Sequence, residues 1–190
     1  MIKKTTPTKI LFFIKKEFLL GGHLQALSSV GVIIISALLL KIAITWDSLT
    51  TFYLLFYAIY AFDRYQGLKQ DAFTNSQRTA HIKSYKKFIP LIIATSILLA
   101  FVILIFKSNL TTIIFSVILI FSGLLYGMVF KPITKRIIAF KNLYVSVFFA
   151  CLVFVPIIYY QIQVKNLIFI QLIVLFLLIF LKTWLMQIFL

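Results

Sequence analysis

The sequence is short of cysteine, histidine and acidic residues, and each shortage excludes a kind of site. It has one cysteine, two histidines and four acidic residues in a chain of 190. A single cysteine, Cys151, excludes a disulfide framework and a thiolate metal site, and its place in an apolar run predicts a small buried side chain. His23 and His81 have no second histidine or cysteine at ligand spacing, so we expect neither to bind a metal. No glycine-rich nucleotide loop or nucleophile elbow is present.

Charged residues are also scarce, while apolar residues dominate. Charged residues make up 12% and hydrophobic residues 63% of the chain, whereas a soluble domain is about half apolar and about a quarter charged. A soluble protein of this composition would expose large apolar patches and aggregate. The apolar runs are continuous and do not alternate with polar residues, which excludes a transmembrane β-barrel. The sequence therefore predicts an all-α fold, a polytopic bundle of membrane helices.

The few charged residues are mostly positive, and the net charge is +15. In a soluble protein this charge would indicate nucleic acid as a partner. In a membrane protein, positive residues mark the cytoplasmic loops and contact anionic lipid headgroups. We therefore expect membrane lipids as partners, and no nucleic acid.

Six apolar runs are long enough to cross a bilayer, which takes about 20 residues at a rise of about 1.5 Å each. Lysines 15 and 16 and Glu17 interrupt the apolar stretch that precedes these runs. We expect residues 1–22 to form an amphipathic helix on the cytoplasmic surface that ends near Gly21-Gly22. Residues 23–190 are the expected transmembrane domain, with about six spans. The runs are 23–45, 48–66, 88–106, 110–130, 143–162 and 167–190.

The cations alternate between the two sides of these runs. Sixteen of the nineteen fall in the N-terminal segment, after the second and fourth runs, or near the end of the sixth; the other side has Lys41, Lys107 and Lys165. This asymmetry predicts that both the N-terminus and the C-terminus are cytoplasmic. The expected location is a cell membrane, the inner membrane in a bacterium. The chain is still apolar at Leu190, where a last span usually finishes in polar residues, so we expect it to be C-terminally incomplete.

Two of the four acidic residues, Asp63 and Asp71, follow the second run and lie among cations. On one continuous helix, eight residues separate side chains by about 12 Å and about 80°, too far for both carboxylates to bind one ion. A bend near Gly67 would bring them to a common site. The alternative for Asp63 is an ion pair with a nearby cation or a cap on the next helix.

Carboxylates with neighbouring cations suit magnesium diphosphate. Magnesium takes oxygen ligands, usually one or two carboxylates with phosphate and water, and arginine and lysine bind phosphate oxygens. The alternative for each cation is a topology determinant or a lipid contact. Tyr57, Tyr60 and Tyr126 lie near the inner mouth, where they could line a prenyl-binding cavity. The cations are Arg64, Arg78 and Lys83 in one loop, and Lys131, Lys135, Arg136 and Lys141 in the next inner loop.

Two stretches on the cytoplasmic side carry a family resemblance. The first is Tyr60-Ala-Phe-Asp63-Arg64, with Asp71, Asn75 and Arg78; the second is Tyr126-Gly-Met-Val-Phe-Lys131-Pro with Phe140-Lys141-Asn142-Leu143. The pattern resembles the UbiA superfamily of intramembrane prenyltransferases. A complete member is expected to have about nine transmembrane helices, each of about 20 residues, and an aspartate-rich motif in each half. The resemblance implies Mg²⁺ as cofactor, and a prenyl diphosphate and a lipophilic acceptor as substrates.

The resemblance assigns roles to particular residues. Asp63 and Asp71 would be the catalytic magnesium ligands, and Arg64, Arg78, Lys131 and Lys141 would bind the diphosphate. Tyr60 and Gly67 stand where the family commonly has Asn and Asp, so this is a divergent pattern. The second aspartate-rich motif would follow the sixth run, where the chain ends.

The expected function is therefore transfer of a prenyl group from its diphosphate to an aromatic or other lipophilic acceptor, at the cytoplasmic side of the membrane. With half of the family's usual carboxylates, this chain alone is expected to be inactive or weakly active. The alternative is a non-catalytic membrane protein: an inactive or truncated relative, or a subunit that needs a partner. A transporter is disfavoured, because only Pro156 interrupts a span and no acidic residue lies at mid-depth.

Overall fold

The structure is a computed structural model, and it describes residues 6–68, 75–130 and 138–188. Within these ranges every regular element is a helix, which confirms the all-α prediction. A helix coincides with each of the six predicted apolar runs, although the fifth run is divided between two helices. The helices that match the runs are α2 (His23–Leu39), α3 (Trp46–Gly67), α6 (Ile89–Lys107), α7 (Leu110–Leu125), α9 (Ile138–Cys151) with α10 (Val155–Tyr160), and α11 (Asn166–Ile188).

The described residues contain four segments long and apolar enough to cross a membrane, or five if α1 (Thr6–Leu20) and α2 form one bent span. The chain is thus a helical bundle with several potential membrane spans, but a count of six is not confirmed. Helix α3 does not reach the required hydropathy, because it carries Asp47, Asp63 and Arg64 as well as four tyrosines.

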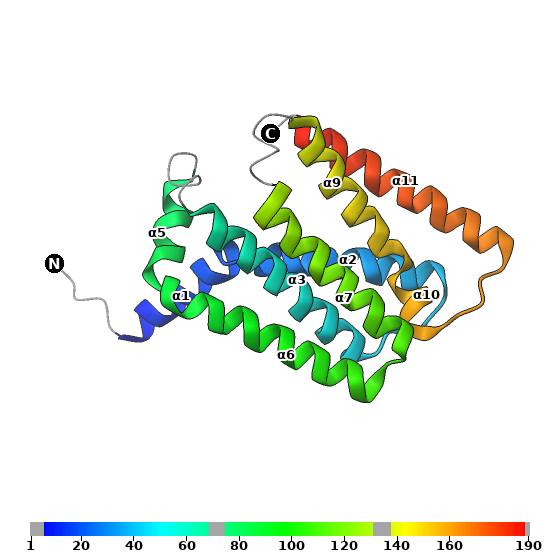
Figure 1. Cartoon of the computed structure of the whole chain (residues 1–190), viewed down its shortest axis with the longest axis horizontal. Helices are drawn as coiled ribbons and strands as arrows, with labels where there is room; N and C mark the ends of the chain where they lie inside the picture. Colours follow the sequence, from blue (N-terminus) through cyan, green and yellow to red (C-terminus); the bar gives the residue numbers. More distant parts are fainter. Residues whose placement is uncertain (1–5, 69–74, 131–137, 189–190) are drawn as a thin grey trace.

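Helix α3 lies at the centre of the bundle, packed mainly against α6, α2 and α7 (Figure 1). Its side chains Phe52, Leu55 and Phe56 are at most 1% exposed. A helix surrounded by protein does not need a fully apolar surface, because neighbouring helices can satisfy its polar groups. By contrast, Phe106 on α6 is 79% exposed, as expected of a helix that faces lipid.

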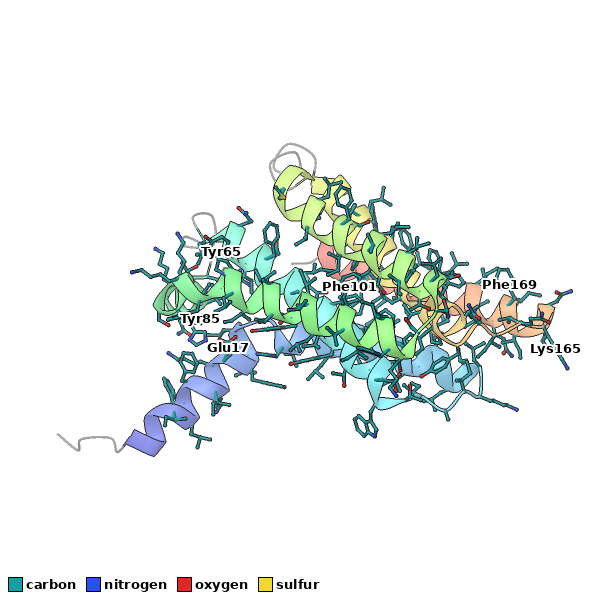
Figure 2. All side chains as sticks on the ribbon, turned by 60° about the horizontal axis from the view of Figure 1, so that its bottom comes forward. Glu17, Tyr65, Tyr85, Phe101, Lys165 and Phe169 are labelled. Carbon is teal, nitrogen blue, oxygen red and sulfur yellow. The ribbon has the colours of Figure 1, made fainter. Side chains whose placement is uncertain are left out.

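The connections at one end of the bundle are tied together by hydrogen bonds. Tyr159 on α10 donates to Asp47 Oδ2 at the start of α3 (2.6 Å), and the Tyr160 hydroxyl lies 3.0 Å from Thr45 Oγ1. Asn109, which caps α7, donates to the Tyr159 carbonyl (3.4 Å). Lys165 lies at this end and Glu17 and Tyr85 at the other (Figure 2).

The fifth run is broken in the middle. Helix α9 ends at Cys151, a 3₁₀ turn follows over Leu152–Phe154, and α10 begins at Val155 with Pro156 in its first turn. Proline removes a backbone donor and displaces the helical hydrogen bonds around it. The hydroxyl of Ser36 on α2 donates to the carbonyl of Val153, which satisfies a backbone group inside the bundle.

The N-terminal helix α1 meets α2 at a bend of 52°. The bend falls at the predicted glycine pair, and Gly22 has a φ of 117°, a backbone conformation that favours glycine. Two short elements follow α3 at the same end of the bundle: α5 (Ser76–Ser84) and the 3₁₀ turn Lys86–Phe88. The predicted interfacial role of residues 1–22 stays a prediction.

Candidate functional site

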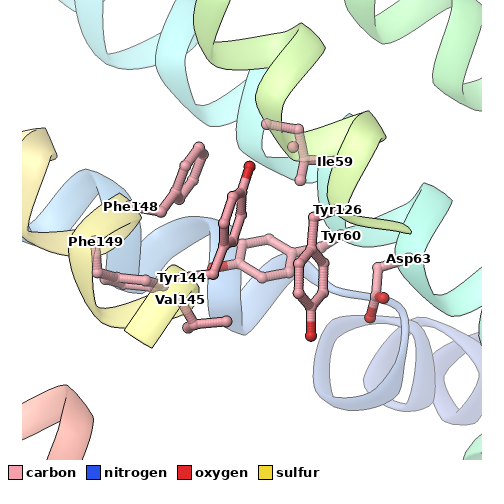
Figure 3. A pocket seen from close by; sticks show the side chains of 9 residues that line it. Ile59, Tyr60, Asp63, Tyr126, Tyr144, Val145, Phe148 and Phe149 are labelled. Carbon is pink, nitrogen blue, oxygen red and sulfur yellow. The ribbon is translucent and has the colours of Figure 1, made fainter. Parts of the chain in front are cut away.

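An aromatic cavity with a carboxylate at its rim lies between α3, α7 and α9 (Figure 3). Its volume is about 150 Å³. Three tyrosines and two phenylalanines form most of the wall, and Asp63 is the one acidic residue among the described residues that line it. The lining residues are Ile59, Tyr60, Asp63, Gly123, Tyr126, Tyr144, Val145, Phe148 and Phe149.

Helix periodicity and one glycine bring these side chains together. Ile59 and Asp63 are four residues apart, so they share one side of α3. A Cβ atom on Gly123 of α7 would lie 2.7 Å from three side-chain carbons of Ile59. Glycine at this position therefore lets α7 approach α3 closely. Tyr126 begins a π-helical turn at the end of α7, Tyr126–Phe130, and such turns occur frequently at functional sites.

Three rings, one from the π-helical turn after α7 and two from α9, form a stack along the cavity wall. The Tyr126 and Tyr144 rings are 5.1 Å apart between centroids, and the Tyr144 and Phe148 rings are 6.4 Å apart, with interplanar angles of 18° and 12°. The Tyr144 hydroxyl donates to the carbonyl of Ser122 on α7 (2.7 Å). This hydrogen bond fixes the position of the central ring between the two helices.

The cavity joins the two stretches that the sequence singled out. Tyr60 and Asp63 come from the first stretch and Tyr126 from the second, and Tyr144 directly follows the second. The prediction that Tyr60 and Tyr126 line a cavity is confirmed, while a prenyl ligand for it stays a prediction. Tyr57 points elsewhere: its ring stacks on His23, 4.2 Å between centroids.

Arg64 and Arg78 do not line this cavity. Arg64 is 6% exposed, and its Nη2 donates to Gln25 Oε1 on α2 (2.8 Å). Arg64 Nη1 is buried and has no hydrogen-bond partner among the described residues. Arg78 is partly buried near the start of α5, where its backbone N–H donates to the capping Asn75 Oδ1 (3.3 Å). The two guanidinium groups are close enough to repel each other.

The remaining predicted site residues cannot be placed at the cavity. Asp71 and Lys131 lie outside the described residues. Lys141 belongs to the first turn of α9, and its side chain is outside the described part. Within the described residues, no group of three histidine, cysteine or acidic side chains could hold a metal. Asp63 is the one carboxylate among the described residues that line the cavity.

Sequence reasoning missed a second polar cluster, centred on Glu17 at the end of α1. Its Oε2 accepts a hydrogen bond from His81 Nε2 on α5 (2.8 Å), and its Oε1 accepts one from the Tyr57 hydroxyl on α3 (3.4 Å). His23 Nε2 lies 3.6 Å from Oε1, and Tyr85 is a further donor. One carboxylate thus connects α1 with α2, α3, and α5 together with Tyr85, which directly follows α5.

The surroundings of Glu17 stabilise its charged form. The residue lies outside the helices that could cross a membrane by themselves. Partial burial favours the neutral acid, but hydrogen bonds from His23, Tyr85 and His81 outweigh it and lower the pKa of Glu17 to about 2. The signal in the sequence was weak, because Glu17 and His81 are separated by 64 positions.

Comparison with known proteins gives no relationship: no family model, no curated protein and no solved structure matches the chain. The fold and the cavity define the chain as an all-helical protein with several helices apolar enough to span a membrane. Its candidate site is an aromatic cavity with a carboxylate at the rim.

Proposed function

We propose that the chain is a UbiA-like intramembrane prenyltransferase, or the N-terminal part of one. One observation carries the proposal: Asp63 lies at the rim of an aromatic cavity that two separate stretches build together. A prenyl diphosphate has the matching chemistry, with an anionic head and an apolar allylic tail. The acceptor would be an aromatic or other lipophilic molecule, and membrane lipids surround the bundle.

The head of the substrate would lie at the Asp63 end. Asp63, together with Asp71, would hold Mg²⁺, which when bound neutralises charge on the departing diphosphate. Arg64, Arg78, Lys131 and Lys141 are the proposed diphosphate-binding cations. The Nη1 atom of Arg64 is a buried donor that an anion would satisfy.

The tail would lie against the rings. The faces of Tyr60, Tyr126 and Phe148 carry negative π density, which stabilises positive charge on an allylic carbon. The C–O bond breaks with its electron pair leaving on the diphosphate. The acceptor then forms a bond to the allylic carbon and releases a proton. Water would have to be kept out during transfer, because it would otherwise capture the carbon.

The membrane arrangement follows the same proposal. Six spans result if α3 crosses the membrane as a buried helix inside the bundle and α2 crosses without α1. The cavity and most of the cations then face the cytoplasm, and the N-terminus is cytoplasmic. The proposed location is a cell membrane, the inner membrane in a bacterium.

Replacing one carboxylate tests the function. Asp63→Asn is expected to lower magnesium-dependent prenyl transfer by at least about 100-fold, because even outer-shell partners of a metal contribute about 10- to 100-fold. The measurement is transfer from radiolabelled prenyl diphosphates to extracted membrane acceptors, using the intact protein in native membranes. Asp47→Asn is the matched control, since Asp47 starts the same helix and binds Tyr159 away from the cavity. Full turnover in the Asp63 variant would contradict its assignment.

A non-catalytic role is the second candidate, favoured by the single described carboxylate at the cavity. A protein of this kind would bind prenyl diphosphates without transferring the prenyl group. Binding measured with non-hydrolysable prenyl thiolodiphosphates separates the two candidates: binding with transfer supports the enzyme, and binding without transfer supports the inactive relative.

A further inference from the structure

A second, larger chamber adjoins the aromatic cavity between α7 and α9. Its volume is about 410 Å³, and nearly all of its wall is apolar. Tyr144 and Phe148 line both chambers, so these two side chains are the wall between them. The other residues of the second chamber are Phe115, Ile118, Leu119, Ser122, Leu143, Val147, Cys151 and Leu152.

Tyr144 is fixed in this wall from three sides. Its hydroxyl donates to the Ser122 carbonyl on the opposite helix (2.7 Å), and its ring stacks between Tyr126 and Phe148. Figure 3 shows the Tyr144 ring standing between Phe148 and the tyrosines on the Asp63 side. The side chain thus bridges the space between α9 and α7 at the boundary of the two chambers.

The volumes indicate what each chamber can hold. A cavity of about 150 Å³ accommodates a benzene-sized group, and this is the volume of the chamber beside Asp63. One five-carbon prenyl unit is of similar size, so a longer chain needs additional space. The second chamber continues along α9 from Tyr144 to Cys151, seven residues or about 10 Å further.

We propose that Tyr144 is a specificity residue that limits the length of the prenyl chain. It closes the chamber beside Asp63 after about one prenyl unit and separates it from the chamber that contains Cys151. This inference rests on the proposed function. A smaller side chain at position 144 joins the two chambers, and the tail of a longer prenyl diphosphate then extends to Cys151.

The single cysteine of the chain provides a reporter inside the second chamber. The probes are dimethylallyl and geranylgeranyl thiolodiphosphate, which carry short and long tails, with the detergent-solubilised full chain and magnesium present. Affinity is measured by titration, and occupancy of the second chamber by the rate at which N-ethylmaleimide modifies Cys151, followed by mass spectrometry.

In the unchanged protein we expect the short probe to bind and neither probe to slow the modification of Cys151. In Tyr144→Ala, the affinity for the long probe should rise by about tenfold or more, the gain from burying about two further methylene groups. In the same variant, the long probe should slow the modification of Cys151 by a similar factor, about tenfold. Tyr126→Ala is the matched control: it enlarges the first chamber and keeps the wall, so the long probe should leave Cys151 reactive.

Circular dichroism and the modification rate without probe show whether each variant is folded, and Tyr144→Leu carries the same test if the alanine variant is not. Protection of Cys151 by the long probe with Tyr144 in place would overturn the role of Tyr144 and leave the proposed function standing. If a folded Tyr144 variant binds the short and the long probe with the same relative affinity as the unchanged protein, the role of Tyr144 is also overturned and the proposed function stands. Binding of neither probe to any of these proteins would overturn both.

Discussion

The Glu17 carboxylate is the acceptor on which the junction of four segments depends. It accepts hydrogen bonds from His81 and Tyr57, and His23 lies beside it. His23 in turn is 2.5 Å from the Tyr53 hydroxyl through its Nδ1. Removing one partner of such a network leaves several buried donors without an acceptor, which costs more than the hydrogen bond itself.

Replacing this acceptor should destabilise the bundle. We expect Glu17→Ala to lower the free energy of unfolding by about 1–3 kcal/mol, the cost of leaving buried polar groups unsatisfied. Thermal unfolding of the detergent-solubilised protein measures the change. Lys15→Ala is the control on the same helix, because Lys15 is exposed, and it should change stability by less than about 0.5 kcal/mol. Equal stability of the two variants would show that the cluster does not hold the junction.

The Glu17 carboxylate also predicts that the stability of the folded protein depends on pH. The pKa of Glu17 is lowered from 4.5 to about 2, so the folded state binds its proton less readily than the unfolded state. The stabilisation by Glu17 is therefore fully present above about pH 4.5 and is lost as the pH falls toward about 2. Between these values the unfolding temperature of the unchanged protein should fall more steeply than that of Glu17→Gln. Parallel curves for the two proteins would contradict the prediction.

Among the elements, the sequence was most informative about the apolar helices. Continuous runs such as 88–106 and 110–130 predicted α6 and α7, because a long uninterrupted apolar segment that crosses a membrane must satisfy its backbone hydrogen bonds internally, as a helix does. The glycine pair predicted the end of α1. Local pattern was sufficient for each of these.

Contacts between segments that are distant in the sequence could not be predicted from local sequence patterns. Nothing local in α3 shows that it is the central helix, and its polar side chains resemble those of an ordinary surface helix. Arg64 was predicted to bind diphosphate as one of the cations of its loop, which stays a prediction, but the hydrogen bond from its side chain to Gln25 on α2 could not be foreseen. The wall that Tyr144 forms depends on the approach of α7 to α9, which no sequence pattern records.

The close approach of α7 to α3 depends on Gly123. We expect Gly123→Ala to lower the free energy of unfolding by about 1–3 kcal/mol, as overpacking of a core does, because the new Cβ would lie 2.7 Å from Ile59. It should also weaken binding of dimethylallyl thiolodiphosphate, since the same contact forms the cavity wall. Gly31→Ala on α2 is the control, as its Cβ would meet nothing within 4 Å. Unfolding temperature and probe affinity would be measured on both variants, and matching values would disprove the close-packing argument.

At the scale of the whole molecule, the two ends of the bundle differ in chemistry. One end contains Glu17, the buried Arg64 and the cations of α5 and the turn after it. The other end is held by hydrogen bonds between the hydroxyls of Thr45 and Tyr160, from Asn109 to the Tyr159 carbonyl and from Tyr159 to Asp47, the one acidic side chain described there. Trp46, 83% exposed at this second end, is suited to the headgroup region. This division agrees with the charge asymmetry of the loops, and the cavity at the ends of α3 and α7 belongs to the charged end.

The orientation in the membrane can be tested with two exposed lysines from opposite ends. In a Cys151→Ser background, Lys83→Cys and Lys165→Cys each provide one thiol outside the helices that could span the bilayer. A maleimide that does not cross membranes should modify Lys165→Cys in right-side-out vesicles and Lys83→Cys in inverted vesicles, because the charge asymmetry predicts that the cation-rich end faces the cytoplasm. Lys41→Cys is the control for the first result, since Lys41 lies on the same side as Lys165. Modification of both variants from the same side would show that the two ends do not lie on opposite sides of the membrane. Modification of Lys83→Cys in right-side-out vesicles would show that the cation-rich end is not cytoplasmic, and the proposed placement of the cavity would be wrong.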